Sequence, residues 1–309
     1  MRCLVTGATG HLGSYLVRRL LDEGHEVGAL MRTESDPWRI ADVLQRVRVV
    51  EGDLAAADEA AAGVAAFAPE VVFHLAWHGV TSGFRDDPRQ IGINLWGSLR
   101  LLEAARDAGC RTWVGVGSQA EYGAVEGLLH EDLATRPQTM YGAAKLATGV
   151  LGERLCAGAG MRQLWLRLLA IYGPHDDERH LIPSVLLRLL AGETPSLTPG
   201  EQRWDYLYVE DAAEALVRAA LHSNAEGTYN LASGEAFTVR HIVETLRDLV
   251  DPALPLGLGA VPYGKGQIMH LQGDISRLRA ATGWSPVTPL RDGLERTVEW
   301  YRMRAGEGR

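Results

Sequence analysis

The sequence of 309 residues contains few cysteines and very few lysines. Its three cysteines, Cys3, Cys110 and Cys156, are odd in number and far apart, which excludes a disulfide framework and any zinc-binding spacing. This cysteine usage is typical of a reducing compartment, so we predict a cytoplasmic protein without a metal site. Lysine accounts for only two of the 31 basic residues, Lys145 and Lys265.

Long apolar runs and an excess of positive charge are also absent. No stretch of 18 or more uncharged apolar residues occurs, and the apolar run that follows Met1 and Arg2 is too short for a signal peptide. The 39 acidic residues outnumber the 31 basic ones, and the net charge of -8 has the wrong sign for binding a nucleic-acid backbone. We therefore expect neither a membrane nor a nucleic acid as partner.

The first half of the chain alternates short apolar runs with longer segments in which apolar residues recur every three or four positions. This alternation is typical of a parallel sheet buried on both faces, and predicts a doubly wound α/β fold. The predicted strands are Cys3–Thr6, His25–Met31, Val47–Glu51, Val71–Leu75, Thr112–Gly117 and Gln163–Leu169. The predicted helices are Gly13–Glu23, Asp58–Phe67, Gln90–Ala108, Thr139–Ala157, Ile182–Ala191, Glu210–His222 and Val239–Val250.

After Tyr172 the alternation loosens into loops that contain proline and glycine. We interpret this later part as a smaller cap over the edge of the sheet. Residues 1–165 are predicted to form a dinucleotide-binding domain, and residues 166–309 mainly a substrate-binding cap. A segment of the later part, about 204–231, is expected to return to the core sheet.

A glycine-rich turn joins the first predicted strand to the first predicted helix. Gly7 allows a tight turn, Gly10 lets the backbone approach a pyrophosphate, and Gly13 lets the helix pack against the strand. Strand, turn and helix follow in the order that a dinucleotide-binding turn requires. The residues predicted to contact a cofactor here are Gly7, Thr9, Gly10, His11, Leu12 and Gly13.

The G-x-x-G-x-x-G spacing after a threonine resembles the extended short-chain dehydrogenase/reductase family, whose members mostly modify nucleotide sugars. The resemblance continues through Gly52-Asp53-Leu54, Phe73-His74-Leu75-Ala76, Asn94 with Gly97, and the segment 203–211. It implies a Rossmann-type sheet, a nicotinamide dinucleotide cofactor and a nucleotide-diphosphate sugar as substrate. It also implies a homodimer formed by the helices Gln90–Ala108 and Thr139–Ala157. Further cofactor contacts are implied for Asp53, Leu54, Leu75, Ala76 and Asn94.

The end of the second predicted strand bears on which dinucleotide is bound. A cofactor with a free ribose diol favours an acidic residue roughly 20 residues after the glycines, and no carboxylate stands there. Arg32 stands there instead, and a guanidinium can bind a 2′-phosphate through parallel hydrogen bonds. We therefore predict NADP(H) in preference to NAD(H). The alternative is that Arg32 is an ordinary solvated arginine.

Three polar residues are predicted to form the catalytic centre. Tyr141 and Lys145 are four residues apart and share one face of a predicted helix. Arginine supplies nearly all other positive charge, so position 145 requires an ammonium, which can stabilise a phenolate and approach ribose hydroxyls. Ser118 ends a strand at the carboxyl edge of the sheet, where α/β proteins bind ligands.

The family resemblance assigns a role to each of these residues. It implies that Tyr141 is the general acid/base, that Ser118 hydrogen-bonds the substrate oxygen, and that Lys145 holds the nicotinamide ribose and lowers the pKa of the phenol. Tyr141 and Lys145 are thus expected to contact the cofactor as well.

The residues after Ser118 narrow the reaction. Gln119 and Ala120 stand where the family's dehydratases carry an Asp-Glu pair, and the decarboxylases carry a glutamate where Ala120 stands. Elimination of water requires an acid and a base, which Gln and Ala cannot supply, so dehydration is disfavoured. Decarboxylation is disfavoured as well, because the glutamate of the decarboxylases is missing. Glu121 lies one residue later, and a shifted turn could recruit it. Ketone reduction and epimerisation through a transient ketone remain.

Substrate contacts are expected from Ser118, Gln119, His180 and Arg203. His180 resembles a substrate-side histidine that acts as an acid in some family members, although a capping or surface histidine gives the same pattern. Arg203 is expected to bind the substrate phosphates, with a salt bridge as the alternative. Ala170 stands where many relatives carry an asparagine that touches the sugar.

Taken together, these patterns predict an NADPH-dependent 4-ketoreductase of a nucleotide-linked 6-deoxysugar. The alternative enzyme is an NAD-dependent nucleotide-sugar 4-epimerase. A lesser alternative is a non-catalytic regulator that binds a dinucleotide, which would need no paired phenol and ammonium.

Overall fold

Seven parallel strands form the central sheet of the computed structural model, which describes residues 1–307. Their order, β12-β7-β5-β4-β1-β2-β3, places strands on both sides of β1 and confirms the doubly wound α/β fold. The strands are β1 (Arg2–Thr6), β2 (Glu26–Met31), β3 (Arg48–Glu51), β4 (Val71–His74), β5 (Thr112–Ser118), β7 (Arg162–Leu168) and β12 (Gly227–Leu231). β12 lies within the segment 204–231, which the sequence predicts to return to the core sheet, and β7 continues past residue 165.

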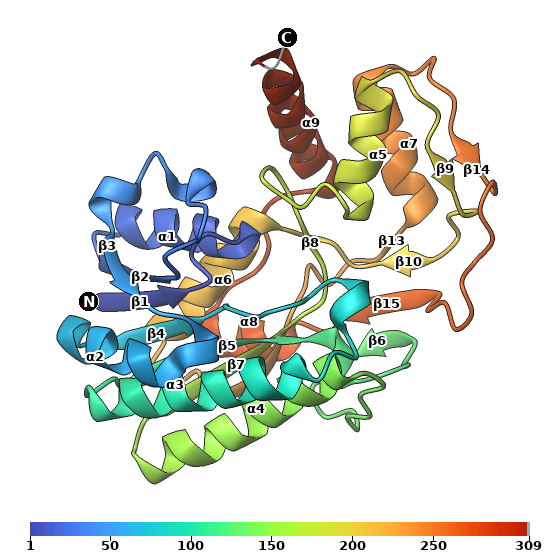
Figure 1. The fold of residues 1–309 in the computed structure, drawn as a ribbon. Helices are drawn as coiled ribbons and strands as arrows, with labels where there is room; N and C mark the ends of the chain where they lie inside the picture. The colour runs from blue at the N-terminus through green and yellow to red at the C-terminus, as the bar shows by residue number, and fades with distance from the viewer. Residues whose placement is uncertain (308–309) are drawn as a thin grey trace.

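Helices cover both faces of this sheet (Figure 1). One face is covered by α1 (His11–Asp22) and α6 (Val209–Leu221), with α8 (Ser276–Thr282) beside α6. The other face is covered by α2 (Ala57–Phe67), α3 (Trp96–Asp107) and α4 (Met140–Gly158).

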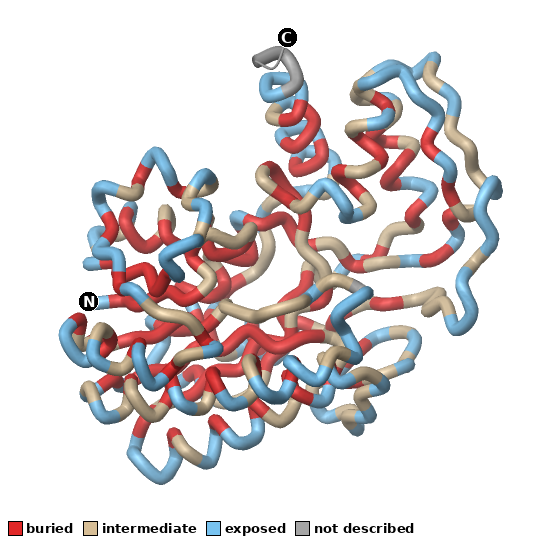
Figure 2. Tube along the Cα trace, in the orientation of Figure 1, coloured by how far each residue is buried: buried red, intermediate tan, exposed pale blue. Residues whose placement is uncertain are grey.

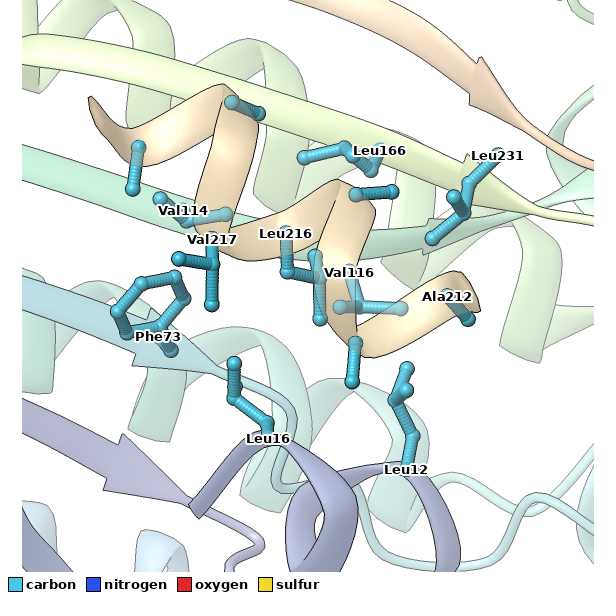
Figure 3. Packing of buried hydrophobic residues seen from close by; sticks show 14 of the residues in the cluster. Leu12, Leu16, Phe73, Val114, Val116, Leu166, Ala212, Leu216, Val217 and Leu231 are labelled. Atoms are coloured by element: carbon cyan, nitrogen blue, oxygen red, sulfur yellow. The ribbon is translucent and has the colours of Figure 1, made fainter. Parts of the chain in front are cut away.

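The strands are buried on both faces because successive side chains enter opposite cores. In β1, Val5 lies in the core under α1 and α6, and its neighbour Leu4 lies in the core under α2 and α3. Burying one such side chain contributes roughly 1.5–3 kcal/mol. Figure 3 shows the first of these cores, where side chains of α6 meet those of α1 and of four strands. The labelled residues are Leu12, Leu16, Phe73, Val114, Val116, Leu166, Ala212, Leu216, Val217 and Leu231.

The single helix predicted over Gln90–Ala108 has two parts. It begins as a π-helix, η5 (Gln90–Leu95), and continues as α3 from Trp96. The wide π-turn brings Gln90 and Asn94, both fully buried, against the loop that follows β4. Such insertions often accompany functional sites.

The cap lies beyond the carboxyl ends of the strands and has its own apolar core (Figure 1). Its helices are α5 (Leu181–Leu190), α7 (Val239–Val250) and α9 (Leu290–Glu307). A four-stranded sheet in the order β13-β10-β15-β6 contains β6 (Gly127–Leu129), β10 (Arg203–Trp204), β13 (Phe237–Thr238) and β15 (His270–Gly273). Two short pairs are β8 (Ile171–Tyr172) with β11 (Leu207–Tyr208), and β9 (Ser196–Leu197) with β14 (Gly257–Leu258).

Short 3-10 turns complete the secondary structure. They are η1 (Trp38–Ile40), η2 (Leu44–Arg46), η3 (Leu54–Ala56), η4 (Ser82–Phe84) and η6 (Gln119–Glu121). Figure 2 shows buried backbone running along the central strands and exposed backbone on the outer turns of the helices. Within residues 1–307, no helix is long and apolar enough to cross a membrane.

Candidate active site

The glycine turn after β1 requires glycine at two positions, for two different reasons. Gly7 has a φ of +70°, and a Cβ there would lie 2.8 Å from the Ala76 nitrogen. A Cβ on Gly13 would lie 2.0 Å from the Gly7 carbonyl oxygen, so α1 can approach the turn only without a side chain. Gly10 precedes α1 in extended conformation and makes no side-chain cap. The first turn of α1 therefore begins just beyond the carboxyl end of β1, where its N–H groups favour an anion.

Hydrogen bonds fix the chain where it leaves β4. The Thr6 hydroxyl accepts the Leu75 and Ala76 N–H groups at 3.2 and 3.0 Å. His74 lies 3.0 Å from this hydroxyl through Nδ1 and 2.7 Å from the Ser98 hydroxyl through Nε2. The predicted cofactor wall of Leu75 and Ala76 is thus held from behind by buried polar side chains.

Burial of His74 predicts a pH-dependent stability. Burial, with a smaller effect of the Lys145 charge, lowers the pKa of His74 from 6.5 to about 3. The unfolded chain therefore takes up this proton first, so the stabilisation is complete above pH 6.5 and is lost as the pH falls toward 3. We expect His74 to contribute about 2 kcal/mol to the fall in the free energy of unfolding between pH 7 and pH 5 in urea titrations. Burial also lowers the pKa of His175, to about 4, which adds to the same fall. H74N should therefore reduce the fall by about 2 kcal/mol, whereas H222N, at an exposed histidine, should leave it unchanged.

The predicted adenine-side residues are held in place by local contacts. The Asp53 carboxylate accepts the Ala55 N–H at 3.0 Å and so begins η3. A Cβ on Gly97 would lie 2.2 Å from the Leu54 carbonyl oxygen, so glycine lets α3 approach this turn. Asn94 accepts the His78 N–H at 2.7 Å and donates to the His78 carbonyl at 2.8 Å. Asn94 thus anchors the loop after β4. Its contribution to cofactor binding would come from holding this loop in position.

The structure brings Ser118, Tyr141 and Lys145 together at one edge of the sheet. Ser118 is the last residue of β5, and its hydroxyl interacts with the Tyr141 phenol. Tyr141 and Lys145 lie one turn apart on α4. Thr139 caps the N-terminus of this helix, because its hydroxyl accepts the Gly142 N–H at 3.2 Å. Lys145 Nζ donates to the carbonyl of Val116, also on β5, at 2.7 Å.

Burial sets the direction of the pKa shifts of Tyr141 and Lys145. It raises the pKa of Tyr141, and interactions with the Ser118 hydroxyl and the Arg85 charge only partly oppose the rise. The lowered phenol pKa that the family resemblance implies is therefore not seen in this arrangement. Burial also lowers the pKa of Lys145 from 10.5 to about 7, against the opposing charge of Glu121. The loss of hydration outweighs the neighbouring charges at both residues.

Glu121 does not join the catalytic residues, so the shifted turn that could have recruited it is not formed. Its carboxylate is fully buried and accepts the Ser118 N–H at 2.8 Å, the Trp165 Nε1–H at 3.0 Å and the Arg167 Nε–H at 2.8 Å. This carboxylate caps η6 and neutralises a buried guanidinium. Gln119 and Ala120 form the rest of that turn, so it offers no free carboxyl group for acid or base chemistry.

Arg32 follows the last residue of β2 and is exposed. Its nearest charged partner is Glu34, with 3.5 Å between Nη1 and the carboxylate oxygen Oε1. Both side chains are more than half exposed, so this pair is weak. The guanidinium is therefore accessible at the carboxyl end of the strand next to β1.

A buried carboxylate that sequence reasoning missed connects two predicted site residues. Asp176 lies 3.2 Å from Nδ1 of His11 in the glycine turn and 2.8 Å from Nδ1 of His180, which precedes α5. Burial alone would raise the pKa of Asp176, but the two histidines hold it at about 2. Asp176 in turn raises the pKa of His180. In the sequence, the four-residue spacing of Asp176 and His180 could have indicated the contact between these two side chains.

Arg203 lies in the cap, where its guanidinium donates to the Ala236 carbonyl at 2.7 Å. It lines a cavity of about 510 Å³ together with Phe237 and His241. An adjoining cavity of about 680 Å³ shares Phe237 and also contains Tyr206. Among the described residues, neither Ser118, Tyr141 nor Lys145 lines these two cavities. No group of three or more potential metal ligands is assembled within residues 1–307.

Comparison with known proteins agrees with this geometry. A family model described as the NAD dependent epimerase/dehydratase family matches residues 3–232. The chain belongs to this family. It is therefore an enzyme of the extended short-chain dehydrogenase/reductase class, as its resemblance to that class predicted.

Relatives and solved structures match over nearly the whole enzyme. It is 32% identical to a UDP-glucose 4-epimerase of Mycolicibacterium smegmatis, over 99% of this chain and 100% of the relative. It is 27% identical to a GDP-6-deoxy-D-mannose reductase of Pseudomonas aeruginosa, over 99% of each chain. The structure of a Thermus thermophilus UDP-glucose 4-epimerase in complex with NAD has a TM-score of 0.85 at 28% identity, covering 98% of this chain and 99% of the other.

Proposed function

We propose that the enzyme is an NADP(H)-dependent ketoreductase that reduces the 4-keto group of a nucleotide-linked 6-deoxysugar. The observation that supports this most directly is the convergence of Ser118, Tyr141 and Lys145 beside a turn that offers no free carboxyl group. A phenol and a hydroxyl are sufficient for reduction of a ketone, whereas elimination of water also needs a carboxyl acid and base.

In the proposed reaction, Tyr141 gives its phenolic proton to the carbonyl oxygen as that oxygen becomes an alkoxide. The Ser118 hydroxyl donates a hydrogen bond to the same oxygen and orients the carbonyl. Lys145 binds the ribose hydroxyls next to the nicotinamide and offsets negative charge on the phenol oxygen. When bound, the nicotinamide supplies the hydride. His180 and Arg203 are proposed to contact the sugar and the diphosphate.

The residues proposed to hold the dinucleotide fit an anionic ligand. The N-terminus of α1 would hold the pyrophosphate through the glycine turn, and the backbone of Leu75 and Ala76 would form one wall of the site. Arg32 is proposed to bind a 2′-phosphate. The other residues proposed to contact the dinucleotide are Thr9, His11, Leu12, Asp53, Leu54, Tyr141 and Lys145.

Replacing Arg32 tests the cofactor preference. R32A should raise KM for NADPH roughly 10- to 100-fold, because a charge-assisted phosphate contact is lost, and should leave KM for NADH nearly unchanged. Steady-state kinetics with both cofactors measures this difference. R111A is the matched control, since Arg111 is also exposed and paired with a carboxylate but precedes β5 at the opposite edge of the sheet. Equal effects on the two cofactors would contradict the assignment.

The epimerase alternative is favoured by the names of several relatives and solved structures. An epimerase would retain NAD through gel filtration and would convert UDP-glucose into its C4 epimer without added cofactor. The reductase would lose its cofactor on the column and would consume NADPH only when given a 4-keto sugar nucleotide. Purified enzyme that retains NAD and consumes no NADPH would refute the reductase assignment. A regulator without catalytic activity would do neither, and the complete phenol, hydroxyl and ammonium set disfavours it.

A homodimer formed through α3 and α4 is also proposed. These two helices and the adjoining η5 contact one another and carry exposed large apolar residues, which is unusual for an outer face. The residues are Ile91, Trp96, Met140, Val150 and Leu151. Light scattering after gel filtration should give twice the chain mass of 33.6 kDa.

A further inference from the structure

Trp77 lies in the loop after β4 and contacts both residues proposed for proton transfer and ribose binding. Lys145 Nζ is 3.7 Å from the centre of its indole ring. The Tyr141 ring meets the indole edge-on, at 6.1 Å between centroids and an interplanar angle of 86°. The indole is therefore the side chain that touches both the phenol ring and the ammonium.

A buried amide holds this ring in place. The indole Nε1–H donates to Gln90 Oε1 at 2.8 Å, and the Gln90 amide donates to the Gly79 and Phe84 carbonyls at 2.8 and 2.9 Å. Asn94 also donates to Gln90 Oε1 at 2.8 Å. Because Gln90 and Asn94 are fully buried on the π-helix, the indole has little freedom to turn away from Lys145.

We propose that Trp77 is a positioning residue that stabilises the protonated form of Lys145 and fixes the place of its ammonium. An ammonium carries three donors, and among the described residues the Val116 carbonyl is the hydrogen-bond acceptor that Lys145 Nζ reaches. The face of the indole offers the buried charge a second attractive contact. This inference rests on the proposed role of Lys145 in holding a ribose, which requires a charged donor.

Other charged groups around Lys145 do not replace the indole. Glu121 of η6 favours the charged form, but its carboxylate is already paired with Arg167. His74 on β4 is neutral because its own pKa is low. Tyr141 lies on the same helix as Lys145, and Arg85 lies over the Tyr141 ring at 5.9 Å. Burial, which lowers the pKa of Lys145, is therefore opposed mainly by Glu121 and by the indole.

The scarcity of lysine allows a direct test. Full-length protein labelled with ε-¹³C lysine has two side-chain signals, and K265R identifies the one that belongs to Lys145. The ring current of Trp77 should shift the Lys145 signal upfield. W77L should abolish that shift and lower the titration midpoint of Lys145 by about one pH unit. W77F keeps an aromatic face and should retain most of both effects, and the Lys265 signal should not move in either variant.

Kinetics and folding controls separate this role from a structural one. Urea titrations establish that each variant is folded. As the pH rises and Lys145 loses its proton, KM for the cofactor should increase. In folded W77L the midpoint of this increase should lie at a lower pH than in the wild type, and W77F should show the wild-type dependence of KM on pH. An unchanged Lys145 midpoint in folded W77L would overturn the inference. If W77L does not fold, the wild-type spectrum provides the test: a Lys145 signal that is not shifted upfield would overturn the inference about Trp77. A displaced midpoint without any ketoreductase activity would instead refute only the proposed function.

Discussion

Replacing Tyr141 with phenylalanine should lower kcat by about a hundredfold or more while cofactor affinity stays nearly unchanged. The variant loses only the phenolic oxygen, which is the group proposed to give its proton to the substrate carbonyl. The ring remains to pack edge-on against Trp77. Steady-state turnover with a 4-keto sugar nucleotide, together with cofactor titration by tryptophan fluorescence, measures the two quantities separately.

The matched control for this prediction is Y229F. Tyr229 lies on β12 and is buried, and its hydroxyl bonds to the backbone of Glu226, just before that strand, and not to Ser118 or Lys145. Y229F should keep nearly full turnover. Turnover above about a tenth of the wild-type value in Y141F would remove the phenol from the chemical step, because general acid catalysis is usually worth a hundredfold or more.

Replacing Arg167 with methionine should lower the free energy of unfolding by about 3–5 kcal/mol. The variant leaves the Glu121 carboxylate buried without its ion-pair partner, although the Ser118 and Trp165 N–H groups still bond to it. Urea titration at neutral pH measures the loss. R218M is the control, because Arg218 and Glu214 form an exposed pair one helical turn apart whose loss should cost under about 1 kcal/mol.

A double variant distinguishes loss of the charge partner from loss of packing. E121Q/R167M has neither buried charge and should recover most of the stability lost by R167M alone. If the double variant is no more stable than R167M, the cost comes from packing around the Arg167 side chain and not from an unpaired Glu121. The activity of R167M should also fall, since Glu121 bonds to the backbone of Ser118.

Features of the enzyme that depend on neighbouring residues could be predicted from its sequence. The apolar runs predicted six of the seven core strands within a few residues, and the four-residue spacing of Tyr141 and Lys145 placed both on one face of α4. The glycine turn was predictable because the backbone at Gly7 and Gly13 excludes any side chain. In each case at least one physical cause lies within one or two turns of chain. At the glycine turn it is the φ of +70° at Gly7 and the close approach of Gly13 to the Gly7 carbonyl.

Features that depend on distant residues could not be predicted. Glu121 of η6 meets Arg167 of β7, 46 residues later, and Asp176 meets His11 across the boundary between core and cap. The two-residue strands of the cap are too short to show any periodicity. The sequence also gave no sign that Trp77 touches Lys145, since the contact depends on the path of a loop held by a buried amide.

The direction of the Tyr141 pKa shift illustrates the same limit. The residue pattern identifies an ammonium near a phenol, and that pair by itself favours the phenolate. Whether the phenol becomes more or less acidic depends on how much water the fold removes, and here burial has the larger effect.

The carboxylate of Asp176 has a consequence for how core and cap act together. One buried negative charge faces two imidazoles, so movement of either ring away from Asp176 alters the electrostatic surroundings of the other ring. His11 belongs to the dinucleotide turn, and His180 begins the first helix of the cap. A ligand that moves one of these rings therefore changes how strongly Asp176 holds the other ring, and thermodynamic linkage requires a second ligand at that other ring to affect binding of the first by the same amount.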